Sequence, residues 1–297
     1  MYKSHFGLTE SPFGITPDTS FFFLCPSSQE ALNTLLIAAR NGEGFIKITG
    51  EVGTGKTLLC RKFMSTLDSN FVTAYIPNPF LEPRTLLMAL ADELEIHLDK
   101  DVDQHNLLKS INHRLLILAR EGKRVLVCLD EAQAIPLESL EALRLLTNLE
   151  TEKRKLLQIV LFGQPELNRN LQNDAIRQLA QRITFHYRLE PLTKDDLDFY
   201  ISHRLSVAGY QGSRLFTRGA VRQLNVCSGG IPRLVNILAH KAMMAAYGEG
   251  RREVTARHVK AAAKDTIAAK GSWRWWWLLL PLGTLLAGSG VVWAYLQ

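Results

Sequence analysis

The stretch that decides the fold is FIKITGEVGTGKTLLCRKFMSTL, residues 45–67. Its first five residues are typical of a buried β-strand and its last eleven of a helix. Between them lies the pattern G-x-x-x-x-G-K-T, with Gly50, Gly55, Lys56 and Thr57 at the fixed positions. A glycine-rich loop in this place turns backbone N–H groups toward phosphate oxygens, and the following helix adds its positive N-terminal end. A glycine-rich turn that matches this pattern by chance would lack the preceding strand and the following helix. The sequence therefore predicts a phosphate-binding loop.

This loop predicts ATP as the ligand and Mg²⁺ as the cofactor. Lys56 is expected to neutralise the β- and γ-phosphates, and Thr57 to hold the metal ion. The residues expected to bind the nucleotide through this loop are Gly50, Glu51, Val52, Gly53, Thr54, Gly55, Lys56, Thr57 and Leu58.

A second motif, VLVCLDEAQ at 125–133, places two carboxylates at the end of an apolar strand. If this strand neighbours the strand at 45–49, Asp130 and Glu131 lie beside the phosphate loop. Asp130 is then expected to bind Mg²⁺ through water, and Glu131 to orient and polarise the attacking water. The alternative, in which either residue caps a helix, leaves the apolar strand unexplained.

The remaining pattern predicts an α/β fold with a parallel sheet covered on both faces. Helix-length segments separate five short apolar runs, at 45–49, 72–76, 125–130, 157–163 and 183–189. We predict a lead-in and first helix at 1–40, a sheet domain at 41–190 and a helical domain at 191–270.

Helix ends follow from capping residues. We expect Ser27 and Glu30 to form a capping box for the first helix, which Asn41 and Gly42 close. In the helical domain, helix starts are predicted at Thr193 with Asp196, at Thr217, at Pro232 and at Thr255.

Two further polar residues have weaker patterns. Gln164 ends the strand at 157–163, where its amide could reach the γ-phosphate or the attacking water, although a glutamine before proline is also common in a turn. Arg233 lies in the first turn of a predicted helix, where an arginine usually faces solvent.

Several motifs together indicate a family. They are MYKSHFGL (1–8), PFGITPD (12–18), GEVGTGKT (50–57), LDEAQ (129–133), LFGQPEL (161–167), LAQRI (179–183) and GGIPRL (229–234). Across residues 1 to about 270 the sequence resembles the AAA+ ATPases of the general secretion pathway protein A (ExeA) type.

The resemblance implies a five-stranded sheet, a helical lid and assembly into a ring, often a hexamer. It implies that Arg182 is the arginine finger acting on a neighbouring subunit, with Arg177 as the alternative, and that Arg233 is the lid arginine that senses nucleotide. Gln164 departs from the family pattern, because many AAA+ proteins carry Asn or Thr there.

The C-terminal sequence predicts a single transmembrane helix at 275–296. Residues 275–297 carry no charged side chain, and as a helix they would extend about 34 Å, enough for a hydrocarbon core of about 30 Å. Aromatic residues at both ends resemble interfacial belts. They are Trp273, Trp275, Trp276, Trp277, Trp293 and Tyr295.

Charge and cysteine usage complete the prediction. Basic residues gather at 251–274, before the span, which predicts an ATPase domain in the cytoplasm of a bacterium and a single-pass anchor in its inner membrane. The start of the sequence lacks the apolar region of a signal peptide. The four cysteines show no metal-ligand spacing and are expected to be buried reduced thiols.

These features predict a membrane-anchored AAA+ ATPase that forms a ring and contacts inner-membrane lipid. By resemblance it assembles a type IV (MSHA-like) pilus or a related secretion machine through a membrane partner. The alternatives are a DNA-binding AAA+ ATPase, using the basic helix with Arg257, Lys260 and Lys264, and a nucleotide-dependent scaffold without rapid turnover. Lipid headgroups already account for these cations, so no nucleic acid is expected.

Overall fold

This computed structural model describes residues 2–98, 102–147, 150–151 and 154–266, so the predicted span at 275–296 lies outside the described residues. The chain divides into two compact units. The sheet unit is residues 16–191, and the helical unit combines the residues up to Ile15 with those from Leu192 onward. The start of the chain therefore packs with the helical unit, and not with residues 16–40.

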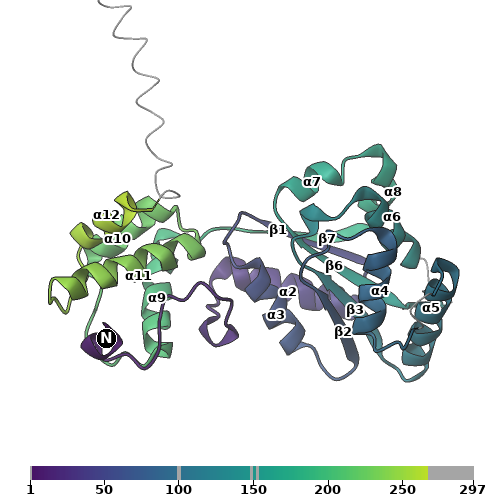
Figure 1. The fold of residues 1–297 in the computed structure, drawn as a ribbon, viewed down its shortest axis with the longest axis horizontal. Coiled ribbons are helices and arrows are strands. Elements are labelled where there is room, and N and C mark those ends of the chain that lie inside the picture. Colours follow the sequence, from purple (N-terminus) through teal and green to yellow (C-terminus); the bar gives the residue numbers. More distant parts are fainter. Residues whose placement is uncertain (1, 99–101, 148–149, 152–153, 267–297) are drawn as a thin grey trace, which may run out of the picture. The chain divides into compact units, whose positions relative to one another are not determined.

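The sheet unit contains a parallel sheet of five strands in the order β2-β3-β6-β1-β7 (Figure 1). The strands are β1 (Phe45–Gly50), β2 (Phe71–Ile76), β3 (Arg124–Leu129), β6 (Leu157–Gly163) and β7 (Ile183–Leu189). All five predicted strands and their parallel arrangement are confirmed. A short antiparallel pair, β4 (Glu150–Thr151) and β5 (Arg154–Lys155), was not predicted.

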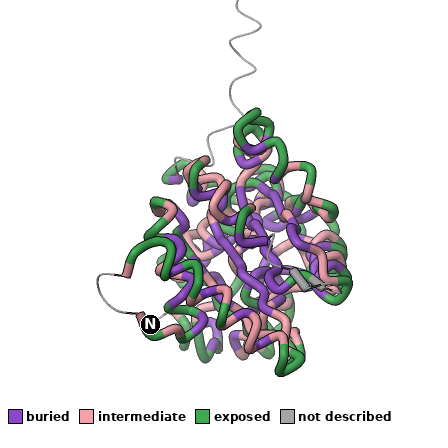
Figure 2. Tube along the Cα trace, turned by 90° about the vertical axis from the view of Figure 1, so that its right-hand side faces the viewer, coloured by how far each residue is buried: buried purple, intermediate pink, exposed green. Residues whose placement is uncertain are grey.

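Helices cover both faces of the sheet (Figure 1). Successive side chains of a strand point to opposite faces, so Leu126 and Cys128 of β3 pack with α2 (Pro26–Asn41) and α3 (Lys56–Thr66). The alternate residues pack against the opposite layer, which includes α4 (Pro83–Glu93), α5 (Gln104–Arg120) and α6 (Leu137–Leu146). Double burial explains why β3 and β6 are largely apolar, and Figure 2 shows the buried segments inside the molecule.

Short helices complete this unit. They are η1 (Thr19–Phe21), η2 (Ala132–Ala134), α7 (Glu166–Asn170), η3 (Asp174–Ile176) and α8 (Arg177–Ala180).

The start of α2 differs from the prediction. The helix begins at Pro26 with Cys25 as N-cap, so the Ser27–Glu30 capping box is wrong. Proline suits the first helical position because it lacks an N–H group that would need a partner. The Ser27 hydroxyl accepts the Glu190 N–H at 2.9 Å, and the Tyr187 hydroxyl donates to the Glu30 carboxylate at 2.9 Å. Both side chains thus tie α2 to β7 and the residue after it. The predicted end of the helix at Asn41 and Gly42 is confirmed.

The helical unit consists of α1 (Tyr2–Phe6), α9 (Lys194–Val207), α10 (Arg218–Ser228), α11 (Pro232–Gly248) and α12 (Ala256–Lys264). The predicted starts are confirmed. Thr193 and Asp196 form a capping box, Thr217 caps α10, Pro232 is the first residue of α11, and Thr255 caps α12 together with His258.

A buried arginine fixes the beginning of the chain to this unit. The Arg204 guanidinium donates to the carbonyls of Pro12 and Gly14. Phe13, which is 2% exposed, packs edge-on against Phe216 with ring centroids 5.6 Å apart. These contacts explain the aromatic and proline-rich opening, whose residues serve as anchors without forming a long regular element.

The cysteine prediction can be compared with the structure directly, whereas the predicted span at 275–296 cannot. Cys25, Cys60 and Cys128 are buried, Cys227 is half-buried, and all four are free thiols. Among the described helices, none has both the length and the apolar character to cross a bilayer.

Candidate functional site

The phosphate loop follows β1 and leads directly into α3. Gly53 and Gly55 adopt φ values of +82° and +102°, which suit glycine because a Cβ would be strained there. A Cβ at Gly50 would lie 2.8 Å from Thr54 Oγ1 and 3.0 Å from the Leu189 carbonyl oxygen. The loop geometry therefore needs glycine at three of its positions and leaves the first N–H groups of α3 available to an anion.

Lys56 is the first residue of α3 and is 5% exposed. Its Nζ donates to the carbonyl oxygens of Gly50 at 2.8 Å and Glu51 at 3.1 Å. Burial lowers the pKa of Lys56, while the carboxylates of Glu131 and Asp130 oppose that shift. A buried ammonium that donates to two neutral carbonyls is stabilised strongly by a polyanion at hydrogen-bond distance.

Thr57 and Asp130 are in contact, as the motifs predict, although β1 and β3 are not adjacent in the sheet. The Thr57 Oγ1 donates to Asp130 Oδ2 at 2.5 Å. The strands β1 and β3 are not neighbours, because β6 lies between them. The condition on which the prediction depended, that these two strands are neighbours, is not met, and the contact arises because α3 packs against β6 and brings Thr57 across its carboxyl end.

A hydroxyl and a carboxylate at hydrogen-bond distance are the hard oxygen ligands that Mg²⁺ takes from proteins, alongside water and phosphate. Within the described ranges no three His, Cys, Asp or Glu side chains gather into a metal site. The residues thus fit Mg²⁺, which when bound with ATP neutralises charge on the β- and γ-phosphates.

Tyr75 on β2 was missed by the sequence analysis. Its hydroxyl donates to Asp130 Oδ2 at 3.4 Å, a long hydrogen bond. Burial, followed by the charge of Asp130, raises the pKa of Tyr75 to about 12. The phenol therefore stays protonated at neutral pH and remains a donor to the carboxylate. No sequence signal marks it, because an aromatic residue on a strand is ordinary.

Glu131 stands in an unusual backbone conformation after β3. Its φ of +50° is left-handed, a conformation that costs a non-glycine residue about 1 kcal/mol or more. Its Oε2 accepts hydrogen bonds from Gln133 Nε2 at 2.6 Å and from Gln164 Nε2 at 3.1 Å. The structure thus brings Gln164 to the carboxylate that is expected to orient the water, at the carboxyl ends of the adjacent strands β3 and β6.

Gln133 is the second residue that the sequence analysis missed. Besides contacting Glu131, its Oε1 accepts the Gln164 backbone N–H at 2.9 Å, and its own carbonyl accepts Asn170 Nδ2 at 2.9 Å. A Cβ on Gly163 would approach Gln133 Oε1 to 3.3 Å. Gln133 therefore links Glu131 to the end of β6. It lies within the quoted LDEAQ motif, so the motif itself was the available signal.

Gln133→Ala is expected to lower kcat for ATP hydrolysis roughly 10- to 100-fold while leaving the KM for ATP within about twofold. The reason is that Glu131 loses its 2.6 Å hydrogen bond while the phosphate loop is untouched. Steady-state ATPase assays check this, with Asn170→Ala, which removes only the bond to the Gln133 carbonyl, as the matched control. An unchanged kcat would exclude a positioning role for Gln133.

The three arginines singled out in the sequence lie at different places. Arg182 follows α8 and is half-buried; its guanidinium lies 3.3 Å from Thr147 Oγ1 and 3.4 Å from the Arg144 carbonyl oxygen. Arg177, the first residue of α8, and Arg233, the second residue of α11, are exposed. The roles of all three stay predictions.

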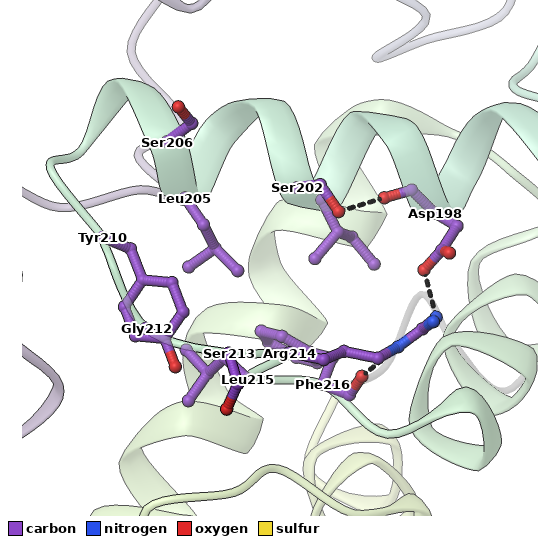
Figure 3. A pocket seen from close by; sticks show the side chains of 11 residues that line it. Asp198, Ser202, Leu205, Ser206, Tyr210, Gly212, Ser213, Arg214, Leu215 and Phe216 are labelled. Carbon is purple, nitrogen blue, oxygen red and sulfur yellow. Dashed lines mark hydrogen bonds and ion pairs between the residues drawn. The ribbon is translucent and has the colours of Figure 1, made fainter.

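The helical unit also contains a pocket of about 390 Å³ between α9 and the segment 210–216 (Figure 3). Arg214 donates to Asp198 and to the Phe216 carbonyl, which closes one side of it (Figure 3). None of the predicted site residues lines this pocket, so it is separate from the phosphate loop.

Comparison with known proteins agrees with this geometry. The AAA domain family matches residues 39–171, which include the phosphate loop, Asp130 and Glu131. Over 98% of its length the chain is 42% identical to General secretion pathway protein A of Aeromonas hydrophila, and the match covers 53% of that relative. The chain is therefore similar to the ExeA-type AAA+ ATPases. Its glycine-rich loop and these carboxylates are the elements of a P-loop nucleotide site. It spans about half the length of the curated relative it matches.

Solved structures share the fold of this chain. Cdc6p of Pyrobaculum aerophilum has a TM-score of 0.67 at 18% identity, covering 86% of this chain and 70% of that one. ORC2 of Aeropyrum pernix has a TM-score of 0.61 at 18% identity, covering 86% and 72%. A Walker-type ATPase of Pyrococcus abyssi has a TM-score of 0.58 at 16% identity, covering 94% and 80%. At such identities the likeness shows the fold alone.

Proposed function

We propose that this chain is an ExeA-type ATPase anchored in the bacterial inner membrane and that its ATP cycle drives assembly of a type IV (MSHA-like) pilus or a related secretion machine. The observation that carries the proposal is the 42% identity to General secretion pathway protein A, which extends over nearly the whole chain. The anchor is the uncharged sequence at 275–296, and the ATPase units lie in the cytoplasm.

The bound nucleotide controls the cycle of this machine. Lys56, Thr57 and Asp130 hold ATP with its metal ion, and Glu131 with Gln164 prepares the water. The helical unit acts as the lid, with Arg233 sensing the nucleotide, and subunits form a ring in which Arg182 completes the neighbouring site. ATP binding and hydrolysis then switch the conformation that a membrane partner recognises.

The partner is tested by gentle detergent capture of the full-length protein from its native bacterium. Glu131→Gln, locked with ATP, is expected to retain inner-membrane components of a pilus or secretion machine. Lys56→Ala, which cannot hold the nucleotide, is the matched control and should lose them. If the same proteins accompany both variants, or if only nucleic-acid-associated proteins accompany Glu131→Gln, the proposed function is wrong.

A further inference from the structure

Positive charge is concentrated in the helical unit. Residues 192–266 contain 12 lysines and arginines against 6 aspartates and glutamates, whereas residues 16–191 contain 20 against 22. The net charge of +6 for the whole chain therefore does not describe an evenly basic protein. Charge confined to one unit predicts an anionic partner for that unit.

On α12 the cations share one side of the helix. Arg257, Lys260 and Lys264 are exposed, while Val259 and Ala262 are buried. At 100° per residue the three cations fall within an arc of about 60°, and they extend over about 10 Å along the axis. The helix thus presents a line of positive charge on the side opposite to its packing face.

The neighbouring helix α10 carries further exposed cations. Phe216 and Val254, just before α10 and α12, form a parallel bridge, and a Cβ on Gly219 would lie 3.8 Å from Ala256 Cβ. The two helices therefore start side by side. The exposed side of α10 carries side chains four residues apart, namely Arg218, Arg222 and Val226, of which the valine is 62% exposed.

Few acids offset these cations. Glu249 forms ion pairs with Arg257 and Arg251 and also contacts His258. In the part of the chain that the structure describes, no acidic side chain lies within ion-pair distance of Arg218, Arg222, Lys260 or Lys264. Their charge is available to an external anion.

We propose that this basic face, formed by Arg218, Arg222, Val226, Arg257, Lys260 and Lys264, docks on an anionic phospholipid surface. An exposed apolar side chain among cations fits the boundary between headgroups and acyl chains. The face is also held near a membrane if the anchor exists, because Lys264 is separated from residue 275 by a segment that reaches at most about 40 Å. The inference thus rests on the proposed membrane location and adds how the ATPase is oriented there.

The test compares full-length protein in nanodiscs of phosphatidylcholine alone and of phosphatidylcholine mixed with phosphatidylglycerol. Amide hydrogen exchange of peptides from α10 and α12 is measured, with α9 as internal reference. We expect exchange to slow by at least about twofold in the anionic discs, and high salt to abolish the effect.

Lys260→Glu/Lys264→Glu is expected to remove this protection, because each basic side chain near an anionic surface is worth roughly fivefold in affinity. Lys109→Glu/Lys194→Glu changes the net charge equally at exposed lysines outside the face and should keep the protection. Circular dichroism confirms that both double variants are folded.

Equal exchange in the two kinds of disc would overturn the proposal. Protection by duplex DNA, with none from phosphatidylglycerol, would also overturn it and assign the face to nucleic acid. The anchor is judged separately by alkaline carbonate extraction of native membranes. Release of wild-type protein by carbonate would refute the anchor. Docking by the basic face is supported if both double variants stay in the membrane while only Lys260→Glu/Lys264→Glu loses the protection from hydrogen exchange.

Discussion

Glu131→Gln is expected to bind ATP with Mg²⁺ at nearly wild-type affinity and to hydrolyse it at least about 100-fold more slowly. The amide preserves the size of the side chain but cannot accept a proton from the attacking water. The hydrogen bond between Thr57 and Asp130 and the contacts of Lys56 do not involve Glu131, so the nucleotide-binding geometry is retained.

Equilibrium binding of a fluorescent ATP analogue and single-turnover phosphate release measure the two quantities separately. Glu138→Gln on α6 is the matched control, since Glu138 is exposed and belongs to none of the contacts around Glu131. Normal turnover in Glu131→Gln would remove the role assigned to Glu131, and loss of binding would show that the carboxylate supports the nucleotide itself.

Arg182→Ala is expected to lower kcat by roughly 1000-fold or more while sparing ATP binding, because an arginine finger stabilises charge on the transferred phosphoryl group. Among the described residues of its own subunit, Arg182 makes long contacts, 3.3 Å to Thr147 Oγ1 and 3.4 Å to the Arg144 carbonyl oxygen. Losing them costs about 1 kcal/mol each in folding free energy. Thermal unfolding therefore separates a catalytic defect from a folding defect.

Mixing variants tests whether the arginine acts on a neighbouring subunit. Lys56→Ala subunits lack nucleotide but keep Arg182, so mixing them with Arg182→Ala subunits should restore part of the ATPase activity that each variant lacks alone. Arg177→Ala serves as the comparison, since Arg177 lies on the same segment and is exposed. If Arg177→Ala shows the defect and Arg182→Ala does not, the finger is Arg177. If neither variant is impaired, or mixing restores nothing, the trans-acting role is wrong.

Much of the sheet unit could be predicted because its signals are local. A strand buried on both faces must be largely apolar, as β3 and β6 are, and a phosphate loop must place glycines where φ is positive, as at Gly53 and Gly55. Helix caps such as Thr193 are equally local, because a side chain bonds a backbone N–H three residues away.

The prediction of side-chain contacts failed where a side chain could bond either a nearby residue or one distant in the sequence. Ser27 could have capped α2, but its hydroxyl accepts the Glu190 N–H across 163 residues of sequence. Gln133 belongs to the LDEAQ motif, but the motif does not show which partners its amide contacts. Its position became meaningful only when β3 and β6 paired and brought Glu131 and Gln164 within reach of one amide.

The sequence by itself determined the local patterns of this protein, namely a glycine-rich loop between a strand and a helix and a strand that ends in two carboxylates, and it predicted phosphate and magnesium as their ligands. Only the tertiary structure decided that β6 lies between β1 and β3, and that the first fifteen residues pack with the helical unit. The physical reason is that strand order and the packing of distant segments depend on contacts between residues far apart in the chain, which no local pattern of residues encodes.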